Sequence, residues 1–515
     1  MPTAAAQKRS IDYIGHAGFV VRHDEFRLLI DPWFHPAFLE SWFPFPDNGH
    51  LLGPVAAGSY DALYVSHTHT DHFDRTLLRM LPRSLPVLCA AFRSRELLRE
   101  MRDLGFSDIT VLGHGESVPL SPGIQVTMLL DTSHKEDSAL LVELDGFRFL
   151  DLNDCHPKLT ELPRNVDLLT AQFSGAMWYP NCYSYPRSVM RDKVVQVRSG
   201  LLDTLVRTVA ATDARAYVPC AGPPVFLDPL LRVHNDRDKT IFPHWEDVAA
   251  PFAEAAPQVE IVNVQPGDRI DIVGGKPVTI AASSPAPTDV ADYARRRSAQ
   301  WSAHEQRPDT PVSTIELDAY FSRLIRRNRP LLENYQRDLT ILSGTREWTV
   351  MIRPVPPHPA VVEGRPPASE AGDGTSGDAA TTGDPSGSYE LRVPPRVLRA
   401  IVDGEATWEE ALLSMRIELR RDPDLFDVTL MGLLRYGETP VVTWQLRRDS
   451  SVSDETIVRD GLRIQRYCPH AGEDLADAAI IDGVLECPRH HWAWDLATGR
   501  CVRGGTWPLS VSPAE

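Results

Sequence analysis

Residues 61–72 read Asp-Ala-Leu-Tyr-Val-Ser-His-Thr-His-Thr-Asp-His, an apolar strand that ends at Val65 and is followed at once by polar side chains. Three imidazoles and one carboxylate lie in the last six positions, at His67, His69, Asp71 and His72. This spacing lets one loop offer imidazoles to one metal ion, and a carboxylate with an imidazole to a second ion. The alternative is a polar turn rich in histidine by chance. The length of the motif, directly behind a strand, favours a metal site.

The motif resembles the signature of the metallo-β-lactamase fold superfamily, and residues 10–250 resemble that superfamily in order. The resemblance implies an acidic residue at the end of an early strand, where Asp31 follows Leu28-Leu29-Ile30. It also implies a further histidine ligand at His134 and a carboxylate that bridges two metals at Asp154. Asp71 and Asp154 are the expected catalytic residues. The expected metal ligands are His67, His69, Asp71, His72, His134, Asp154 and His244.

The last ligand of this set has three candidates. His244, in Ile-Phe-Pro-His-Trp-Glu, is the first choice, His234 is the second and Cys220 is the third. Each of these residue types is more often found in a core or on a solvated surface than on a metal. The choice among them therefore remains open at this point.

A second group of ligands lies within the last fifty residues. Cys468-Pro469-His470 is followed, after an interval of sixteen residues, by Cys487-Pro488-Arg489-His490. Two cysteines on one iron and two histidines on the other make a 2Fe–2S centre. Two cysteines and two histidines also bind zinc, although zinc fingers usually group the cysteines before the histidines.

The residues around these pairs resemble Rieske ferredoxins and the Rieske domains of oxygenases, over about residues 441–509. Respiratory-type Rieske domains carry an additional cysteine after each pair. Glu473 and His491 stand in those places here, which resembles the lower-potential, oxygenase type of cluster. Cys501 lies beyond the motif and is expected to be a buried structural thiol.

The presence of both centres in one chain bears on the metal of the N-terminal site. Histidines and carboxylates bind either zinc or iron. Zinc(II) has no accessible redox change and cannot use an electron from a 2Fe–2S cluster. Iron can activate dioxygen when electrons arrive one at a time. We therefore expect non-haem iron at a dinuclear site, or zinc if the protein is a hydrolase.

Several phrases narrow the resemblance to the CMP-N-acetylneuraminate hydroxylase branch of the superfamily. They are Ile14-Gly15-His16-Ala17-Gly18-Phe19, Asp31-Pro32-Trp33, Leu152-Asn153-Asp154-Cys155, residues 172–180 (Gln-Phe-Ser-Gly-Ala-Met-Trp-Tyr-Pro) and Ala221-Gly222-Pro223-Pro224. That family joins a Rieske domain to a metallo-β-lactamase-like domain and hydroxylates the N-acyl group of a sugar nucleotide. The domain order is reversed here and a middle region is added, so we expect another small metabolite as substrate.

A length of 515 residues suggests about three domains. The expected domains are an αββα metallo-β-lactamase-like sandwich at residues 1–287, an α+β middle domain at 288–440 and an all-β Rieske domain at 441–515. Within the middle domain, residues 363–388 have the composition of a disordered loop, which we interpret as an overgrown hairpin connection. The middle domain weakly resembles sterol-carrier proteins. A packing or dimerisation platform is favoured there over a lipid pocket.

Charge and cysteine content exclude some partners. The net charge of −17 argues against nucleic acid, and no apolar run is long enough to span a membrane. Seven cysteines do not form a disulfide framework, and with no apparent signal peptide they predict a cytoplasmic protein.

The expected function is a Rieske-coupled oxygenase that acts on a small-molecule substrate. It would receive electrons from an external ferredoxin or reductase and could form a homodimer. One alternative is a zinc hydrolase with a redox-sensing Rieske domain. Another is an electron-transfer protein whose second metal site is structural.

Overall fold

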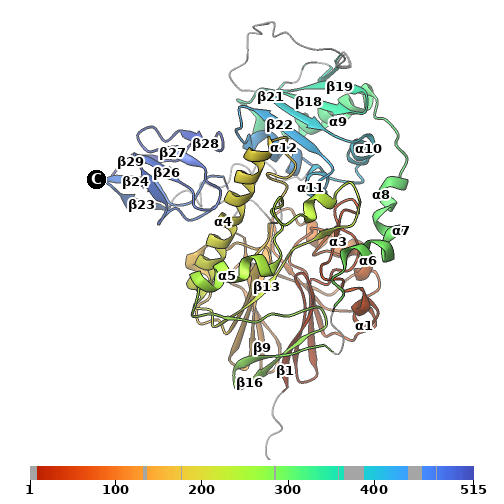
Figure 1. Ribbon diagram of the computed structural model, residues 1–515, viewed down its shortest axis with the longest axis vertical. Coiled ribbons are helices and arrows are strands. Elements are labelled where there is room, and N and C mark those ends of the chain that lie inside the picture. The colour runs from red at the N-terminus through yellow and green to blue at the C-terminus, as the bar shows by residue number, and fades with distance from the viewer. Residues whose placement is uncertain are drawn as a thin grey trace, which may run out of the picture.

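The computed structural model describes residues 8–131, 136–175, 177–282, 286–355, 357, 359–364, 388–438, 455–470 and 472–514. Its N-terminal part is built on two facing sheets (Figure 1). The first has the order β17-β16-β1-β2-β3-β5-β6-β7 and the second the order β15-β13-β12-β11-β10-β9-β8. The strands of the first sheet are β1 (Arg9–Gly15), β2 (Gly18–His23), β3 (Phe26–Ile30), β5 (Ala62–Tyr64), β6 (Val87–Ala90), β7 (Ile109–Leu112), β16 (Arg269–Val273) and β17 (Lys276–Ile280). Those of the second are β8 (Ser117–Ser121), β9 (Ile124–Leu130), β10 (Ser138–Leu144), β11 (Phe147–Asp151), β12 (Leu168–Gln172), β13 (Ala216–Cys220) and β15 (Glu260–Ile261).

Helices cover the outer face of each sheet, which gives the predicted αββα sandwich. Between the sheets, Phe19 of β2 meets Phe149 of β11 with ring centroids 5.8 Å apart. Buried side chains of α2 (Arg75–Leu78) and α3 (Glu96–Asp103) pack on the first sheet, and those of α4 (Arg187–Thr212) and α5 (Trp245–Ala255) pack on the second. Each large apolar side chain buried in this way contributes about 1.5–3 kcal/mol to stability. The short helix α1 (Leu52–Ala56) adds Val55 to the core of the first outer layer.

The directions of the strands bring the loops that carry the predicted ligands to one edge of both sheets. In the first sheet, β2 is antiparallel to β3 and β3 is parallel to β5. The β1–β2 turn and the ends of β3 and β5 therefore share an edge. In the second sheet, β11, β12 and β13 run parallel and β10 antiparallel to them. The start of β10 and the ends of β11 to β13 thus also share an edge, and the motif following Val65 lies between the two edges.

The middle domain is a five-stranded sheet of order β20-β19-β18-β21-β22 with helices packed on it. Its strands are β18 (Arg337–Ser343), β19 (Arg346–Ile352), β20 (Val361–Glu363), β21 (Ser388–Arg392) and β22 (Glu418–Asp422). Its helices are α9 (Thr314–Arg327), α10 (Pro395–Asp403), α11 (Trp408–Leu413) and α12 (Val428–Tyr436), and α6 (Val290–Arg296), α7 (Ser298–Trp301) and α8 (Ala303–Gln306) precede them. One face of α9 is buried, at Leu317, Tyr320, Phe321, Leu324 and Ile325.

The apolar face of the middle domain packs on the N-terminal domain. One continuous core joins Trp42 and Trp178 of the N-terminal domain to the middle-domain sheet. The Trp42 indole donates to the Leu413 carbonyl at 2.8 Å, and Arg416 pairs with Asp228 at 2.8 Å. Two short strands, β4 (Trp42–Phe43) and β14 (Val225–Phe226), pair at this junction. The surface is therefore a packing platform within one chain.

The aromatic loop at residues 177–186 also packs at this junction. The rings of Tyr183 and Tyr185 stack at 5.6 Å, and the Tyr185 hydroxyl donates to Asp424 at 2.6 Å. The loop therefore packs most of its rings against the scaffold. Trp178 differs, because its ring packs against the guanidinium of Arg435 at 4.8 Å.

The predicted disordered loop has its ends in one sheet, but the hairpin interpretation is wrong. β20 and β21 lie on opposite sides of the β19–β18 pair, and β21 is parallel to β18. The segment between them is therefore a crossover within one domain. Residues 365–387 lie outside the described residues, so their predicted disorder stays a prediction.

The C-terminal domain consists of two small antiparallel sheets, β23-β24-β29 and β25-β26-β27-β28 (Figure 1). The strands are β23 (Thr456–Arg459), β24 (Leu462–Gln465), β25 (Ala479–Ile481), β26 (Val484–Glu486), β27 (Ala493–Asp495), β28 (Cys501–Arg503) and β29 (Val511–Pro513). The fold is all-β, as predicted, and it lies beside α4. Within the described part of the chain, no helix is both long and apolar enough to cross a membrane.

Candidate metal centre and iron–sulfur site

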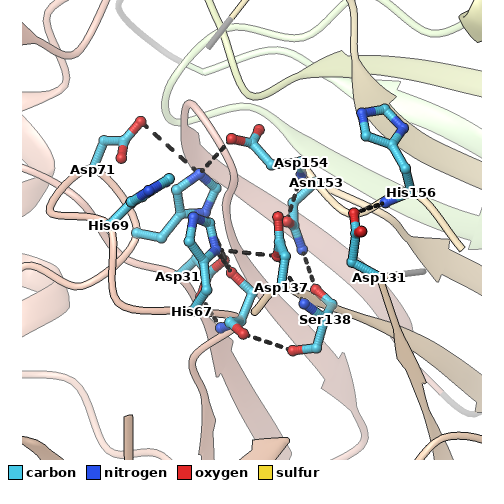
Figure 2. Close-up of polar contacts among 12 residues, drawn as sticks. Asp31, His67, His69, Asp71, Asp131, Asp137, Ser138, Asn153, Asp154 and His156 are labelled. Atoms are coloured by element: carbon cyan, nitrogen blue, oxygen red, sulfur yellow. Dashed lines mark hydrogen bonds and ion pairs between the residues drawn. The ribbon is translucent and has the colours of Figure 1, made fainter. Parts of the chain in front are cut away.

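Three ligand-type side chains meet where the loop after β5 faces the end of β11. The ligand atoms of His67, His69 and Asp154 lie within 4.8 Å of one another. Figure 2 shows the two histidines on one side of this space and Asp154 on the other. Two imidazoles and a carboxylate are a ligand set that both zinc and non-haem iron accept.

A second group adjoins the first. The ligand atoms of His16, Asp71 and His72 also lie within 4.8 Å of one another, and His16 Nε2 is 3.3 Å from Asp71 Oδ2. His72 Nε2 is 4.0 Å from Asp71 Oδ2 and 3.7 Å from Asp154 Oδ2. Asp154 therefore lies between the two groups, where one carboxylate can serve two ions.

Polar contacts at Nδ1 orient the imidazoles of His67 and His72. His72 Nδ1 is 2.9 Å from Asp31 Oδ2, and His67 Nδ1 is 3.2 Å from Asp137 Oδ1. Asp31 is fixed in turn by the backbone N–H of Ser66, which donates to it at 2.8 Å. Carboxylates placed behind histidines in this way set the tautomer and aim Nε2 at a metal.

Unpaired buried atoms show that the centre fits metal ions. Five ligand atoms are buried and have no hydrogen-bond partner in the described part of the chain: His16 Nε2, His67 Nε2, His72 Nε2, Asp71 Oδ1 and Asp154 Oδ1. A buried polar atom left without a partner costs about 1–3 kcal/mol, and a metal ion would remove this cost.

The pKa values of His67 and His72 also indicate a site that fits metal cations. Burial lowers the pKa of His67 well below its usual value, which keeps this imidazole neutral and able to bind a metal. Burial would also lower the pKa of His72, but Asp71, Asp154 and Asp31 raise it to about 10. The excess of carboxylate charge around His72 is the charge that bound cations would neutralise.

The structure does not bring His244 to this centre. Its Nδ1 is 3.1 Å from the Arg237 guanidinium, and its ring packs against Phe45 at 4.9 Å. His234 packs on Phe226 instead. Cys220, the third candidate, lies buried at the end of β13, at the shared edge. The predicted ligand His134 lies outside the described residues.

His16 is the ligand candidate that sequence reasoning missed. It lies in the tight β1–β2 turn with φ of 54°, and its carbonyl accepts from the N–H of Ala221 at 3.0 Å. The available signal was a polar residue in a glycine-rich turn between apolar strands. Its position at the metal edge depends on the order of strands in the sheet, which the motif alone does not give.

The middle domain also contributes to the wall of the centre. Glu409 of α11 places Oε1 3.8 Å from His69 Nε2 and accepts from Arg435 Nε at 3.0 Å. Burial would raise the pKa of Glu409, but Arg435 and His69 hold it below its usual range, so the side chain is a carboxylate. Nothing in the local sequence of α11 identified this residue.

The four predicted iron–sulfur ligands come together in two loops of the C-terminal domain. The ligand atoms of Cys468, His470 and His490 lie within 4.8 Å of one another, and Cys487 Sγ is 3.8 Å from His490 Nδ1. Among the described residues, His470 Nδ1 is buried and has no hydrogen-bond partner, which fits a ligand of iron. Burial, Arg489 and Arg435 lower the pKa of His470 to about 3, so this ring is neutral. Cys501 is half-buried and lies outside this group.

The iron–sulfur site faces the N-terminal domain of its own chain. Arg489 Nη2 donates to His156 Nε2 at 2.7 Å, and Gln172 Nε2 donates to the same atom at 2.8 Å. Two donors on Nε2 require the neutral Nδ1–H tautomer of His156. Gln172 also lies 3.2 Å from the carbonyl of Asp154. A short chain of bonds thus runs from the residue before His490 to the ligand loop.

Known protein families match at both ends of the chain. A model described as "Beta-lactamase superfamily domain" matches residues 10–180, and one described as "Rieske [2Fe-2S] domain" matches residues 434–508. The chain joins a metallo-β-lactamase fold to a C-terminal Rieske domain. The predicted fold and the 2Fe–2S cofactor of the C-terminal domain are thereby confirmed. The Rieske loops hold the four residues that would bind that cluster.

Relatives of this protein include one from Mycolicibacterium smegmatis named a Rieske 2Fe-2S iron-sulfur protein. It is 28% identical over 531 residues, covering 95% of this chain and 97% of the relative. Cytidine monophosphate-N-acetylneuraminic acid hydroxylase from Danio rerio is 27% identical over 226 residues, or 41% of this chain and 38% of that protein. Among solved structures, CmlA, a diiron β-hydroxylase from Streptomyces venezuelae, matches with a TM-score of 0.34 and 16% identity, over 53% of this chain and 55% of CmlA.

Proposed function

We propose that the protein is a Rieske-coupled non-haem iron oxygenase, which hydroxylates or oxidises a small metabolite with dioxygen. The observation that carries this proposal is the contact of Arg489 with His156, two residues beyond Asp154. A one-electron carrier docked on the ligand loop of a second metal site is useful only if that site accepts electrons. Partial similarity to proteins named hydroxylases supports the same conclusion.

When bound, iron in the N-terminal site and the 2Fe–2S cluster would supply dioxygen activation and single electrons. The chain's own residues bind and orient these groups. Asp31 and Asp137 orient the imidazoles, Asp154 lies between the two ligand groups, and Glu409 of α11 borders the site on the side of the middle domain. The proposed ligands of the N-terminal site are His16, His67, His69, Asp71, His72 and Asp154, with His134 as a further candidate.

Isotope labelling tests the proposal. Protein loaded with iron, a ferredoxin and its reductase would be incubated with candidate metabolites under labelled dioxygen, and products examined by mass spectrometry. We expect label from dioxygen in the product and reductant-dependent oxygen uptake. Label that enters only from labelled water, with no need for reductant, would overturn the proposal and support the zinc hydrolase.

Gly200 provides a test of the docking itself. A Cβ at this position of α4 would lie 2.4 Å from the Arg489 carbonyl oxygen. We expect Gly200→Ala to weaken docking by about 1–3 kcal/mol, although alanine favours the helix itself. Hydrogen exchange should become faster around residues 152–158 and 487–492, while the Rieske spectrum and metal content stay unchanged.

Gly53→Ala is the matched control, since a Cβ there would meet no described atom within 4 Å. It should leave exchange in both segments as it is in the wild-type protein. Unchanged exchange in Gly200→Ala would contradict the docked arrangement.

A further inference from the structure

Helix α12 belongs to two hydrophobic cores. Val428 and Tyr436 pack in the core of the Rieske domain together with Cys468 and Cys487. Leu430 and Leu433, on another face of the helix, pack in the core of the middle domain. The helix therefore fixes the Rieske ligands relative to the middle domain, whose α11 reaches the metal centre.

Arg435 lies on this shared helix, between the two centres. Its guanidinium lies 4.8 Å from the centroid of the Trp178 ring and 4.6 Å from that of Tyr436, and its side chain is 11% exposed. It is ion-paired with Glu409, whose side chain is 15% exposed. Two rings and one carboxylate hold the arginine in place, because stacking and pairing both restrict a planar guanidinium.

The Glu409–Arg435 ion pair extends from the N-terminal metal centre to the Rieske site. Glu409 Oε1 is 3.8 Å from His69 Nε2 of the metal centre. At the other end, the Arg435 guanidinium lies against the ring of Tyr436, which packs in the same core as the Rieske ligands Cys468 and Cys487. Phe426, just before α12, packs against the ring of the Rieske ligand His470 at 5.8 Å. Residues of the middle domain thus lie between an imidazole of one centre and an imidazole of the other.

We propose that Glu409 and Arg435 are positioning residues that couple the two centres, Glu409 by orienting His69 and Arg435 by holding a fixed positive charge beside the Rieske site. This inference requires both centres, as the proposed function does, but it does not require that the protein be an oxygenase. The middle domain then contributes positioning residues to both centres, in addition to packing on the N-terminal domain.

The charge of Arg435 has a definite effect on the cluster. Reduction adds one electron, so a nearby positive charge favours the reduced state and raises the reduction potential. Glu409 offsets part of that charge. Removing the arginine should therefore lower the potential of the cluster, and removing the carboxylate charge should raise it.

The experiment is a redox titration of the Rieske cluster followed by EPR in holoprotein variants. We expect Arg435→Met to lower the midpoint potential, Glu409→Gln to raise it, and Arg435→Lys to keep it near the wild-type value. Arg416→Met is the control, because this buried arginine pairs with Asp228 and not with either centre. It should leave the potential unchanged.

A second measurement examines the effect of Glu409 on the N-terminal metal centre. Competition with a chelator, using Zn²⁺ alone as the probe, should show metal affinity of the N-terminal site about 10–100-fold weaker in Glu409→Gln. Glu410→Gln is its control, because glutamine can replace glutamate in the capping box with Thr407.

Potentials that move in the same direction in Arg435→Met and Glu409→Gln, or do not move, would overturn the coupling. So would unchanged zinc affinity in Glu409→Gln. If Arg435→Met fails to fold, the isosteric Glu409→Gln decides both points. Failure of the oxygenase proposal is distinct, because it would appear as product label that enters only from water, whereas the potentials and the zinc affinity would still shift.

Discussion

The Asp154→Ala protein is expected to lose its N-terminal metal ions and substrate oxidation while it keeps a normal Rieske spectrum. Asp154 lies between the two ligand groups, so its removal takes a ligand from one group and a charge from the other. Metal ions contribute several kcal/mol of charge stabilisation, and turnover should fall by about a thousandfold or more. The Rieske ligands lie on a separate domain and should not be affected.

Asp151→Asn is the control for this variant. Asp151 lies three residues earlier, at the end of β11, where it accepts from the Thr170 hydroxyl at 2.7 Å and belongs to neither ligand group. Metal analysis and EPR of both proteins check the prediction. Full metal content in Asp154→Ala would contradict the assigned centre, whereas loss of both spectra would show that the fold had failed.

The Cys468→Ser protein should show the reverse pattern. Loss of one thiolate removes the 2Fe–2S cluster, because each iron needs both of its protein ligands. The N-terminal metals should remain, and reductase-driven turnover should fall to the background rate. Visible and EPR spectra, metal content and oxygen uptake on one preparation measure all three quantities.

Cys501→Ser is its matched control. This thiol is half-buried in the same domain, and its Sγ lies 3.2 Å from the Arg503 carbonyl, away from the ligand group. Its cluster should be intact. Reductase-driven turnover that survives in Cys468→Ser would show that electrons enter by another route.

Sequence reasoning could predict candidate ligands where they are encoded in nearly consecutive residues. The motif from His67 to His72 and the two Cys/His pairs each lie in one or two loops, so spacing alone predicts a ligand role for them, and the structure brings members of each set together. The αββα architecture followed from the same motif through its family resemblance. Asp154 could be predicted as a candidate because it follows an apolar strand and holds the place in the chain order that the family resemblance implies.

The other site residues could not be predicted from the sequence, because their positions depend on the tertiary fold. His16 is about fifty residues before the motif and reaches it only because β2 is antiparallel to β3. Glu409 and Arg435 come from another domain, and their role depends on how α11 and α12 dock. His244 had suitable chemistry and chain order, but it lies beside Arg237 and Phe45 instead.

The central claim is that the N-terminal site accepts electrons delivered by the Rieske cluster of the same chain. An anaerobic reductive titration, with metal content determined on the same sample, tests it most directly. We expect about three electrons per chain, one for the cluster and about two for a pair of irons, falling to the single cluster electron in Asp154→Ala. Uptake of only one electron by the wild-type protein, with zinc in the N-terminal site, would contradict the claim.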